Sequence, residues 1–168
     1  GDTLIVDNTY TISWTKYGSI AAFDVFYSYD NKENWTQIAD DITTLNYSWT
    51  VADTISDQVH FKVVDAGNPD VYDETNAPST IKGSIDLTDP DGAETLVVGE
   101  PFDITWTKTG SIGNIKIEYS TDDFVSDIRT INASYPSDSS PYTWIPGPDD
   151  ITNQDNVKVR SVSYTHLT

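Results

Sequence analysis

The segment Ile12–Ile20 (ISWTKYGSI) decides the fold, because it returns 92 residues later as Ile104–Ile112 (ITWTKTGSI). The same offset aligns residues 3–30 with 95–122 without a gap, and 13 of these 28 positions are identical. Later pieces also correspond after small changes in length: Tyr47–Trp49 with Tyr142–Trp144, and Val59–Lys62 with Val157–Arg160. Self-similarity at one period is typical of repeated structural units. We therefore assign two homologous modules, residues 1–82 and 83–168.

Apolar residues alternate with other residues inside each module, as in Phe23-Val25-Tyr27 and Ile115-Ile117-Tyr119. This period of two is typical of strands with one buried face. Clusters of Gly, Asn, Asp and Pro separate the strands at the short intervals expected of a β-sandwich. The sequence predicts an all-β fold of two tandem immunoglobulin-like or fibronectin-like antiparallel β-sandwiches. We expect four repeated tryptophans in their cores: Trp14, Trp49, Trp106 and Trp144.

The offset of 92 also predicts an incomplete edge in each module. The first module lacks the strand equivalent to Ile85–Leu87, and the second lacks the strand equivalent to Ser79–Lys82. Unpaired edges present open N–H and C=O groups to other chains. We therefore expect other copies or neighbouring repeats as partners, through head-to-tail pairing or filaments. A linker of one or two residues near Gly83 is expected to limit bending between the modules.

The end of the chain resembles a sequence of technical origin. Val162–Leu167 (VSYTHL) matches one frame of a translated transposase adapter used in sequencing-library preparation. We interpret residues 162–168 as an artefact of a metagenomic fragment and leave them out of the fold prediction.

The overall charge limits the classes of partner. With 27 acidic and 9 basic residues, the net charge is −18. Such a field repels phosphate backbones and anionic lipids, so neither nucleic acid nor direct membrane insertion is expected. No apolar run reaches the length of a membrane span. The absence of Cys excludes a disulfide framework within these residues.

Several segments resemble a known extracellular module. Asp89–Thr95, Phe102–Thr107, Gly110–Ile112 and Ile117–Ser120 resemble the Ig-like domain of fungal cell-wall β-glucan assembly proteins. That domain also occurs in tandem in large bacterial and archaeal surface proteins. Pro90–Ala93 departs from the usual Pro-Asn-Gly-Gly of that family. The resemblance implies an extracellular architectural or adhesive role and no catalytic residue.

Catalytic chemistry has little support in the residue inventory. The chain has two histidines, and His166 lies in the segment interpreted as an artefact. His60 alternates with Val59 and Phe61, so we expect its side chain to point to solvent. Neither a Ser-His-Asp system nor a His-containing zinc site is expected. The sequence predicts that the chain is not an enzyme.

Trp35 is the candidate carbohydrate-binding residue. It follows a polar turn and ends the segment Ser28–Trp35, which resembles in part the Asp-box hairpin of sialidases and other propellers, a folding element without activity. An exposed indole can serve as a platform for a sugar ring, and the alternative is hairpin packing. Trp35 has no aromatic counterpart in the second module.

Calcium is the candidate cofactor. The candidate ligands are Asp65, Asp70, Asp73 and Glu74, between two late strands of the first module, with Asp89 and Asp91 as a weaker second cluster. Ca²⁺ takes six to eight hard oxygen ligands, and unneutralised carboxylates repel one another.

Two functions remain open at this stage. The first is a structural spacer or adhesive repeat of a large secreted or cell-surface protein. The second is an ancillary carbohydrate-binding pair of a secreted enzyme, with glycans as partners.

Overall fold

The structure is a computed structural model that describes residues 1–92, 94–148 and 157–163. These residues form strands, turns and loops, and no helix occurs among them. The chain divides into two compact units, Gly1–Gly83 and Ser84–Thr168. The all-β fold class is therefore confirmed.

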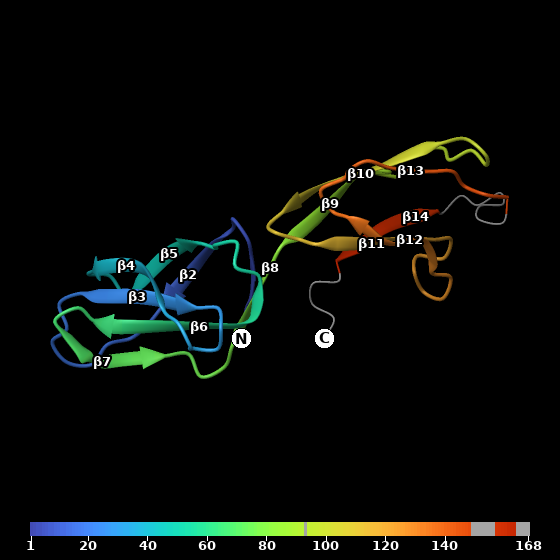
Figure 1. The fold of residues 1–168 in the computed structure, drawn as a ribbon. Coiled ribbons are helices and arrows are strands. Elements are labelled where there is room, and N and C mark those ends of the chain that lie inside the picture. The colour runs from blue at the N-terminus through green and yellow to red at the C-terminus, as the bar shows by residue number, and fades with distance from the viewer. Residues whose placement is uncertain (93, 149–156, 164–168) are drawn as a thin grey trace. The chain divides into compact units, whose positions relative to one another are not determined.

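Unit one forms two sheets, shown in Figure 1. The larger has the strand order β1-β8-β6-β3-β4, with β7 beside β6, and the smaller pairs β2 with β5. The bounds of the strands are β1 Thr3–Ile5, β2 Thr9–Ser13, β3 Phe23–Ser28, β4 Thr36–Ile42, β5 Asn46–Thr50, β6 Ser56–Asp65, β7 Asn68–Glu74 and β8 Ser79–Lys82.

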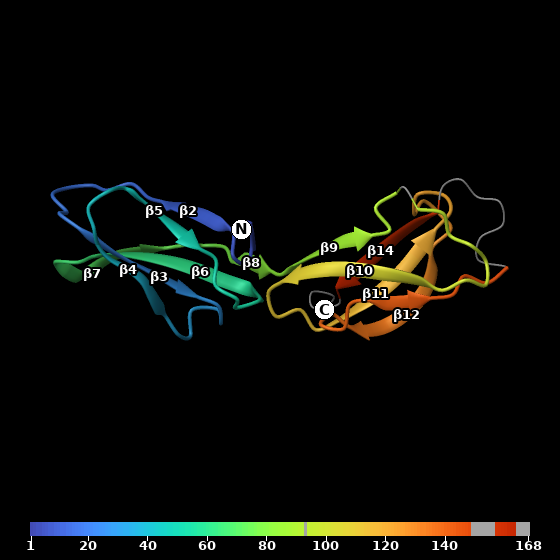
Figure 2. The same cartoon turned by 90° about the horizontal axis from the view of Figure 1, so that it is seen from above.

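Unit two also forms two sheets, as Figure 2 shows from a second direction. Among its described residues, one sheet has the order β13-β10-β9 and the other β12-β11-β14. The bounds are β9 Ser84–Asp89, β10 Phe102–Thr109, β11 Asn114–Ser120, β12 Arg129–Pro136, β13 Tyr142–Trp144 and β14 Lys158–Ser163.

The same aromatic pair joins the two sheets in both units. The ring centroids of Tyr27 and Trp49 lie 4.8 Å apart, and those of Tyr119 and Trp144 lie 5.0 Å apart. All four side chains are buried. Paired rings of this kind bury large apolar areas and favour tilted or edge contacts. The alternating pattern therefore predicted the inward face of these strands correctly.

Two features of unit one differ from the sequence prediction. β1 pairs with β8 in parallel, with Leu4 opposite Ile81, so the sandwich is not purely antiparallel. The segment between two late strands that holds the candidate calcium ligands contains a further strand, β7, which pairs with β6. Almost all of β7 is exposed, so it carries no alternating apolar signal that would reveal a strand.

The repeated tryptophans at positions 14 and 106 have different environments. Trp106 lies in β10 and is 5% exposed, and its indole Nε1 donates to the Ser137 carbonyl oxygen at 2.8 Å. Trp14 lies one residue beyond β2 and is half-buried, with its ring 5.4 Å from that of Phe23. Burial of Trp106 is confirmed, whereas Trp14 is only partly enclosed.

The segment interpreted as an artefact lies partly outside the described residues. Val162 and Ser163 belong to β14 and pair with Lys116 and Ile115 of β11. Residues 164–168 lie outside the described part of the chain.

Candidate binding sites

An aspartate organises the same hairpin in both units. In unit one, Asp30 accepts hydrogen bonds from the Ser28 hydroxyl at 2.7 Å and from the Asn34 backbone N–H at 2.9 Å. In unit two, Asp122 accepts from the Ser120 hydroxyl at 2.8 Å and from the Ser126 backbone N–H at 2.9 Å. Side-chain acceptors of this kind hold tight turns.

These bonds favour the charged form of each carboxyl group. Hydrogen bonds from Asn34 and Ser28 lower the pKa of Asp30 to about 2. Hydrogen bonds from Ser126, Ser120 and nearby backbone N–H groups hold the pKa of Asp122 well below its usual range. Both aspartates are therefore structural acceptors, and the hairpin interpretation of residues 28–35 fits this geometry.

Trp35 lies just before β4, half-buried on the outer side of the larger sheet. The Lys62 ammonium on β6 lies 4.4 Å from the centre of the Trp35 ring, and also 5.3 Å from that of Phe26 and 6.0 Å from that of Tyr72. A cation over an aromatic face is attracted by the ring quadrupole. Lys62 thus occupies one face of the indole that a sugar ring would use.

Unit two contains a counterpart of this contact that sequence comparison missed. Arg160 on β14 corresponds to Lys62, and its guanidinium lies 4.2 Å from the centre of the Phe124 ring. Phe124 comes from the β11–β12 hairpin, as Trp35 comes from the β3–β4 hairpin. The two aromatic residues occupy different places within their hairpins, so alignment by residue number did not connect them. The shared contact supports a hairpin-packing role for Trp35.

The corresponding cations Lys62 of β6 and Arg160 of β14 have different neighbours. Glu118 of β11 stands where Phe26 stands in β3, and it is buried. Arg160 donates to Glu118 Oε2 through Nε at 2.9 Å and Nη2 at 2.8 Å, and Lys116 forms a second ion pair with the same carboxylate. Burial disfavours the charged form, but these cations outweigh it and lower the pKa of Glu118.

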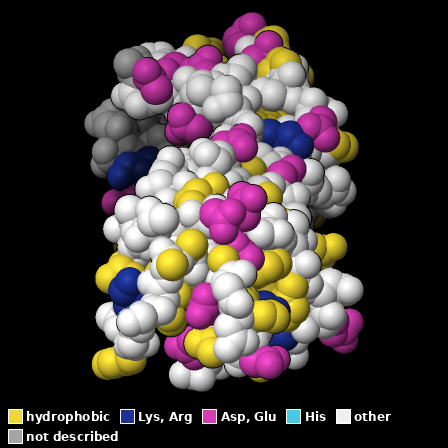
Figure 3. Space-filling model, turned by 90° about the vertical axis from the view of Figure 1, so that its left-hand side faces the viewer, with side chains coloured by type: hydrophobic (Ala, Val, Ile, Leu, Met, Phe, Trp, Pro, Cys, Tyr) yellow, Lys and Arg dark blue, Asp and Glu magenta, His cyan; other side chains and the backbone are white. Residues whose placement is uncertain are grey.

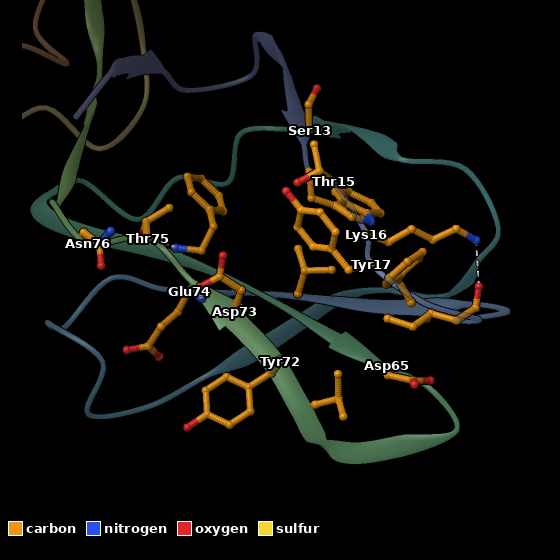
Figure 4. A pocket seen from close by; sticks show the side chains of 16 residues that line it. Ser13, Thr15, Lys16, Tyr17, Asp65, Tyr72, Asp73, Glu74, Thr75 and Asn76 are labelled. Carbon is orange, nitrogen blue, oxygen red and sulfur yellow. Dashed lines mark hydrogen bonds between the residues drawn. The ribbon is translucent and has the colours of Figure 1, made fainter.

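The four candidate calcium ligands do not converge on one point. Asp73 and Glu74 are neighbours in β7, and Figure 4 shows their carboxylates on opposite sides of the strand. Glu74 pairs with Lys32 at 2.5 Å, and Asp65 accepts the Gly67 backbone N–H at 2.9 Å. Asp70 lies in the same strand, with its backbone N–H bonded to Asn68 Oδ1 at 3.2 Å.

Beside the second candidate cluster, Asp89 and Asp91, lies a third acidic residue, Glu94. Glu94 accepts the backbone N–H groups of Asp91 and Gly92, both at 3.0 Å, and these bonds lower its pKa to about 2. Across the described residues, no three His, Cys, Asp or Glu side chains are grouped to hold a metal ion. Figure 3 shows acidic side chains scattered over the face that it draws. The candidate calcium ligands are therefore not gathered into one group of carboxylates in the described part of the chain.

The expectation that His60 points to solvent is wrong. The side chain is 3% exposed, and its Nδ1 lies 3.1 Å from the Thr75 carbonyl oxygen. The Thr75 hydroxyl also accepts the Phe61 backbone N–H at 3.0 Å. The chain that leaves β7 therefore covers the outer face of β6 at this point. His60 is a hydrogen-bonded structural residue.

A groove opens in unit one between the end of β2 and strands β6 and β7. Its volume is about 720 Å³. Figure 4 shows residues that follow β2 on one side and β7 on the other, with the Lys16 ammonium bonded to the Ile20 carbonyl oxygen at 2.8 Å. Apolar side chains line it: Trp14, Phe23, Phe61, Val63 and Val71. Sequence analysis did not predict this groove.

Comparisons with known proteins give a distant structural likeness. No protein-family model matches the sequence, and no curated protein matches it. Among solved structures, the chain is similar to the Clostridium thermocellum CbhA fibronectin(III)-like modules, with 16% identity over 97% of this chain and 87% of that chain. The TM-score is 0.32. The fold assignment therefore rests on the sheet topology and the repeated core.

None of the described residues forms a helix with the length and apolar character needed to span a membrane.

Proposed function

We propose that the chain is a structural repeat of a secreted or cell-surface protein, in which each sandwich serves as a spacer or adhesive unit. The observation that carries the proposal is the repetition of one sandwich with one core. The Tyr27–Trp49 and Tyr119–Trp144 pairs occupy the same place in successive units. Only Gly83 separates the last strand of unit one from the first strand of unit two. Tandem copies of one folded unit extend a protein without adding a new chemistry.

The polar side chains fit this proposal because they serve folding. Asp30 and Asp122 hold hairpins, His60 bonds to Thr75, and Glu118 neutralises two cations. The net charge of −18 favours solubility and repels other polyanions. An acidic surface of this kind suits a protein that works outside the cell beside other folded repeats.

Single-molecule force spectroscopy of the chain held at its two ends tests the spacer role. We expect two unfolding events, each releasing about 290 Å of chain at roughly 3.5 Å per residue. A spacer must keep its fold under load, so both events should occur at forces clearly above the noise. Extension without resolved events would contradict a load-bearing spacer.

Carbohydrate binding is the second candidate, and one observation favours it. Tyr72 is 59% exposed and lies beside Lys62 together with Phe26 and Trp35, which makes an aromatic surface on the outer face of unit one. Aromatic rings with one open side can stack on sugars. Pull-down with insoluble polysaccharides tests it. Binding that is lost in Trp35→Ala and Tyr72→Ala but kept in Phe124→Ala favours this function, and no retention argues against it.

A further inference from the structure

The two units place a cation at the same point of one sheet, Lys62 in unit one and Arg160 in unit two. Arg160 lies directly opposite Glu118 in the β11–β14 ladder, and this buried carboxylate neutralises it. Lys62 lies in the same register opposite Phe26 in the β3–β6 ladder. Among the residues that the structure describes, Lys62 takes part in no ion pair. The position that holds an internal anion in unit two is therefore apolar in unit one.

Aromatic rings surround Lys62 in place of that carboxylate. Its ammonium lies 5.3 Å from the ring centre of Phe26, 4.4 Å from that of Trp35 and 6.0 Å from that of Tyr72. Ring quadrupoles attract a cation but carry no net charge, so the positive charge stays uncompensated. Tyr72 is 59% exposed and the other three side chains are half-buried. The result is an aromatic surface with one open side and an ammonium at its centre.

The neighbouring carboxylates are already engaged. Glu74 lies opposite Lys62 in the β6–β7 ladder, but its carboxylate pairs with Lys32. Asp24 lies two residues before Phe26 in β3, and its carboxylate accepts the Asp41 backbone N–H at 3.1 Å. The more distant acidic residues act over lengths at which salt screens them, since the Debye length is about 8 Å at physiological ionic strength. Lys62 can therefore take an anion from outside the chain.

We propose that this surface binds an acidic polysaccharide through a sugar ring that carries a carboxylate, as in a uronic acid. The C–H face of the sugar stacks on the exposed Tyr72 ring, and the Lys62 ammonium donates a charge-assisted hydrogen bond to the carboxylate. The external carboxylate thus takes the part that Glu118 plays beside Arg160. This inference rests on carbohydrate binding, the second candidate function, and adds the class of sugar.

The aromatic surface favours a sugar over an acidic peptide. An Asp or Glu side chain offers a carboxylate to Lys62 but no flat apolar face to Tyr72. A uronic acid offers both on one rigid ring, so a single residue of the polysaccharide meets both groups. Stacking supplies contact area, and the charge selects against neutral sugars.

NMR titration of the ¹⁵N-labelled full chain at about 0.15 M salt tests the proposal. The ligands are oligosaccharides of galacturonate, mannuronate and glucuronate, each in the carboxylate form and as the neutral methyl ester. We expect saturable shifts of the Trp35 indole and of the Lys62 and Tyr72 amides with at least one carboxylate form. The indole of Trp106, buried in unit two, should not shift. The matching ester should bind at least about tenfold more weakly, because it lacks the charge.

Matched variants identify the groups that bind. Lys62→Gln should weaken binding of the carboxylate form by about tenfold or more, whereas Lys62→Arg should retain it. Tyr72→Ala should weaken binding, and Tyr72→Phe should keep it because the ring remains. Lys158→Gln removes one positive charge from unit two and should have no effect. An unchanged signal from the buried Trp49 indole shows that each variant of unit one is folded.

The outcomes distinguish this inference from carbohydrate binding itself. Equal affinity for the carboxylate and ester forms, or equal affinity of the wild type and Lys62→Gln, would overturn the acidic-sugar assignment and leave carbohydrate binding in place. Absence of saturable shifts with every carboxylate form up to about 10 mM would also overturn it. Retention on insoluble neutral polysaccharides would then still support carbohydrate binding. A glutamate-rich peptide that binds as tightly as the best uronate would assign the surface to acidic peptides and overturn the proposal.

Discussion

The second strands of the two units, β2 and β10, overlap the same repeated segment but differ in length. β2 ends after five residues at Ser13, whereas β10 runs for eight residues to Thr109. The extra length coincides with the partner strand, because residues 105–109 pair with β9. In the part of the chain that the structure describes, the corresponding Ser13 pairs only with Asn46 of β5, and residues 14–17 belong to no strand. Cross-strand pairing, more than intrinsic propensity, therefore sets the length of these strands.

The largest expected effect comes from removing the two tryptophans that differ in enclosure. Trp106→Ala should lower the free energy of unfolding of unit two by about 3–5 kcal/mol, typical of deleting a large buried aromatic. Trp14→Ala should destabilise unit one by less, about 2 kcal/mol, because the ring is only half-buried. Urea unfolding followed by NMR reports each unit separately.

The phenylalanine variants serve as the control for that comparison. Trp106→Phe removes the bond from Nε1 to the Ser137 carbonyl oxygen, whereas the Trp14 indole N–H has no hydrogen-bond partner among the described residues. Trp106→Phe should therefore lower the free energy of unfolding more than Trp14→Phe does. Equal losses from both alanine variants would contradict the difference in enclosure.

The next largest change in stability is expected from replacing Glu118, the buried carboxylate of unit two. Glu118→Gln should destabilise unit two by about 1–2 kcal/mol, because Arg160 and Lys116 then lose a charged acceptor. Lys158→Gln breaks the exposed pair with Asp123 in the same unit and should change stability by less than about 0.5 kcal/mol. Thermal unfolding of both variants measures the contrast. A larger loss from Lys158→Gln would refute this account of Glu118.

The two units should unfold at different pH values on acidification. Folding lowers the pKa of Glu118, Asp122 and Asp127 in unit two, and hydrogen bonds lower that of Glu94 to about 2. A carboxyl group with a lowered pKa stabilises the fold above its unfolded pKa, and this contribution is lost as the pH falls towards the folded pKa.

In unit one, hydrogen bonds lower the pKa of the Asp30 carboxyl to about 2, so its contribution is lost between about pH 4 and pH 2. Unit two should therefore unfold first on acidification from pH 5 to pH 2, as followed by NMR. Asp122→Asn should reduce the difference between the two units in the stability that each loses on acidification. Loss of unit one before unit two would contradict the assignment.

The smallest effect is expected from calcium. Millimolar calcium should leave the melting temperature of both units unchanged, because the carboxylates of Asp65, Asp73 and Glu74 point apart and each already takes part in a hydrogen bond or an ion pair. Calorimetry with and without chelator provides the measurement. A rise on adding calcium that disappears in Asp73→Asn would show that the β7 segment rearranges to bind the ion.

The sequence predicted the features that depend on alternation and repetition. Tyr27, Trp49 and their counterparts were placed in the core because an apolar period of two defines one face of a strand. Strand β7 was missed because a nearly fully exposed strand has no such period. The prediction that His60 is exposed was wrong because Thr75, which buries the imidazole, lies 15 residues away in the sequence, outside the strand pattern. The contact of Lys62 with Trp35 arises where separate strands of the sheet come together, so no single segment of the sequence predicts it.

Hydrogen exchange of backbone amides tests the central comparison most directly. The account attributes the short β2 to the absence of a strand partner, so the amides of Thr15, Lys16 and Tyr17 should exchange rapidly in the full chain. Their counterparts Thr107, Lys108 and Thr109 lie in the stretch of β10 that β9 covers, so as a group they should exchange far more slowly. Equal protection of the two groups would contradict the claim that unit one has an open edge where unit two has a covered one.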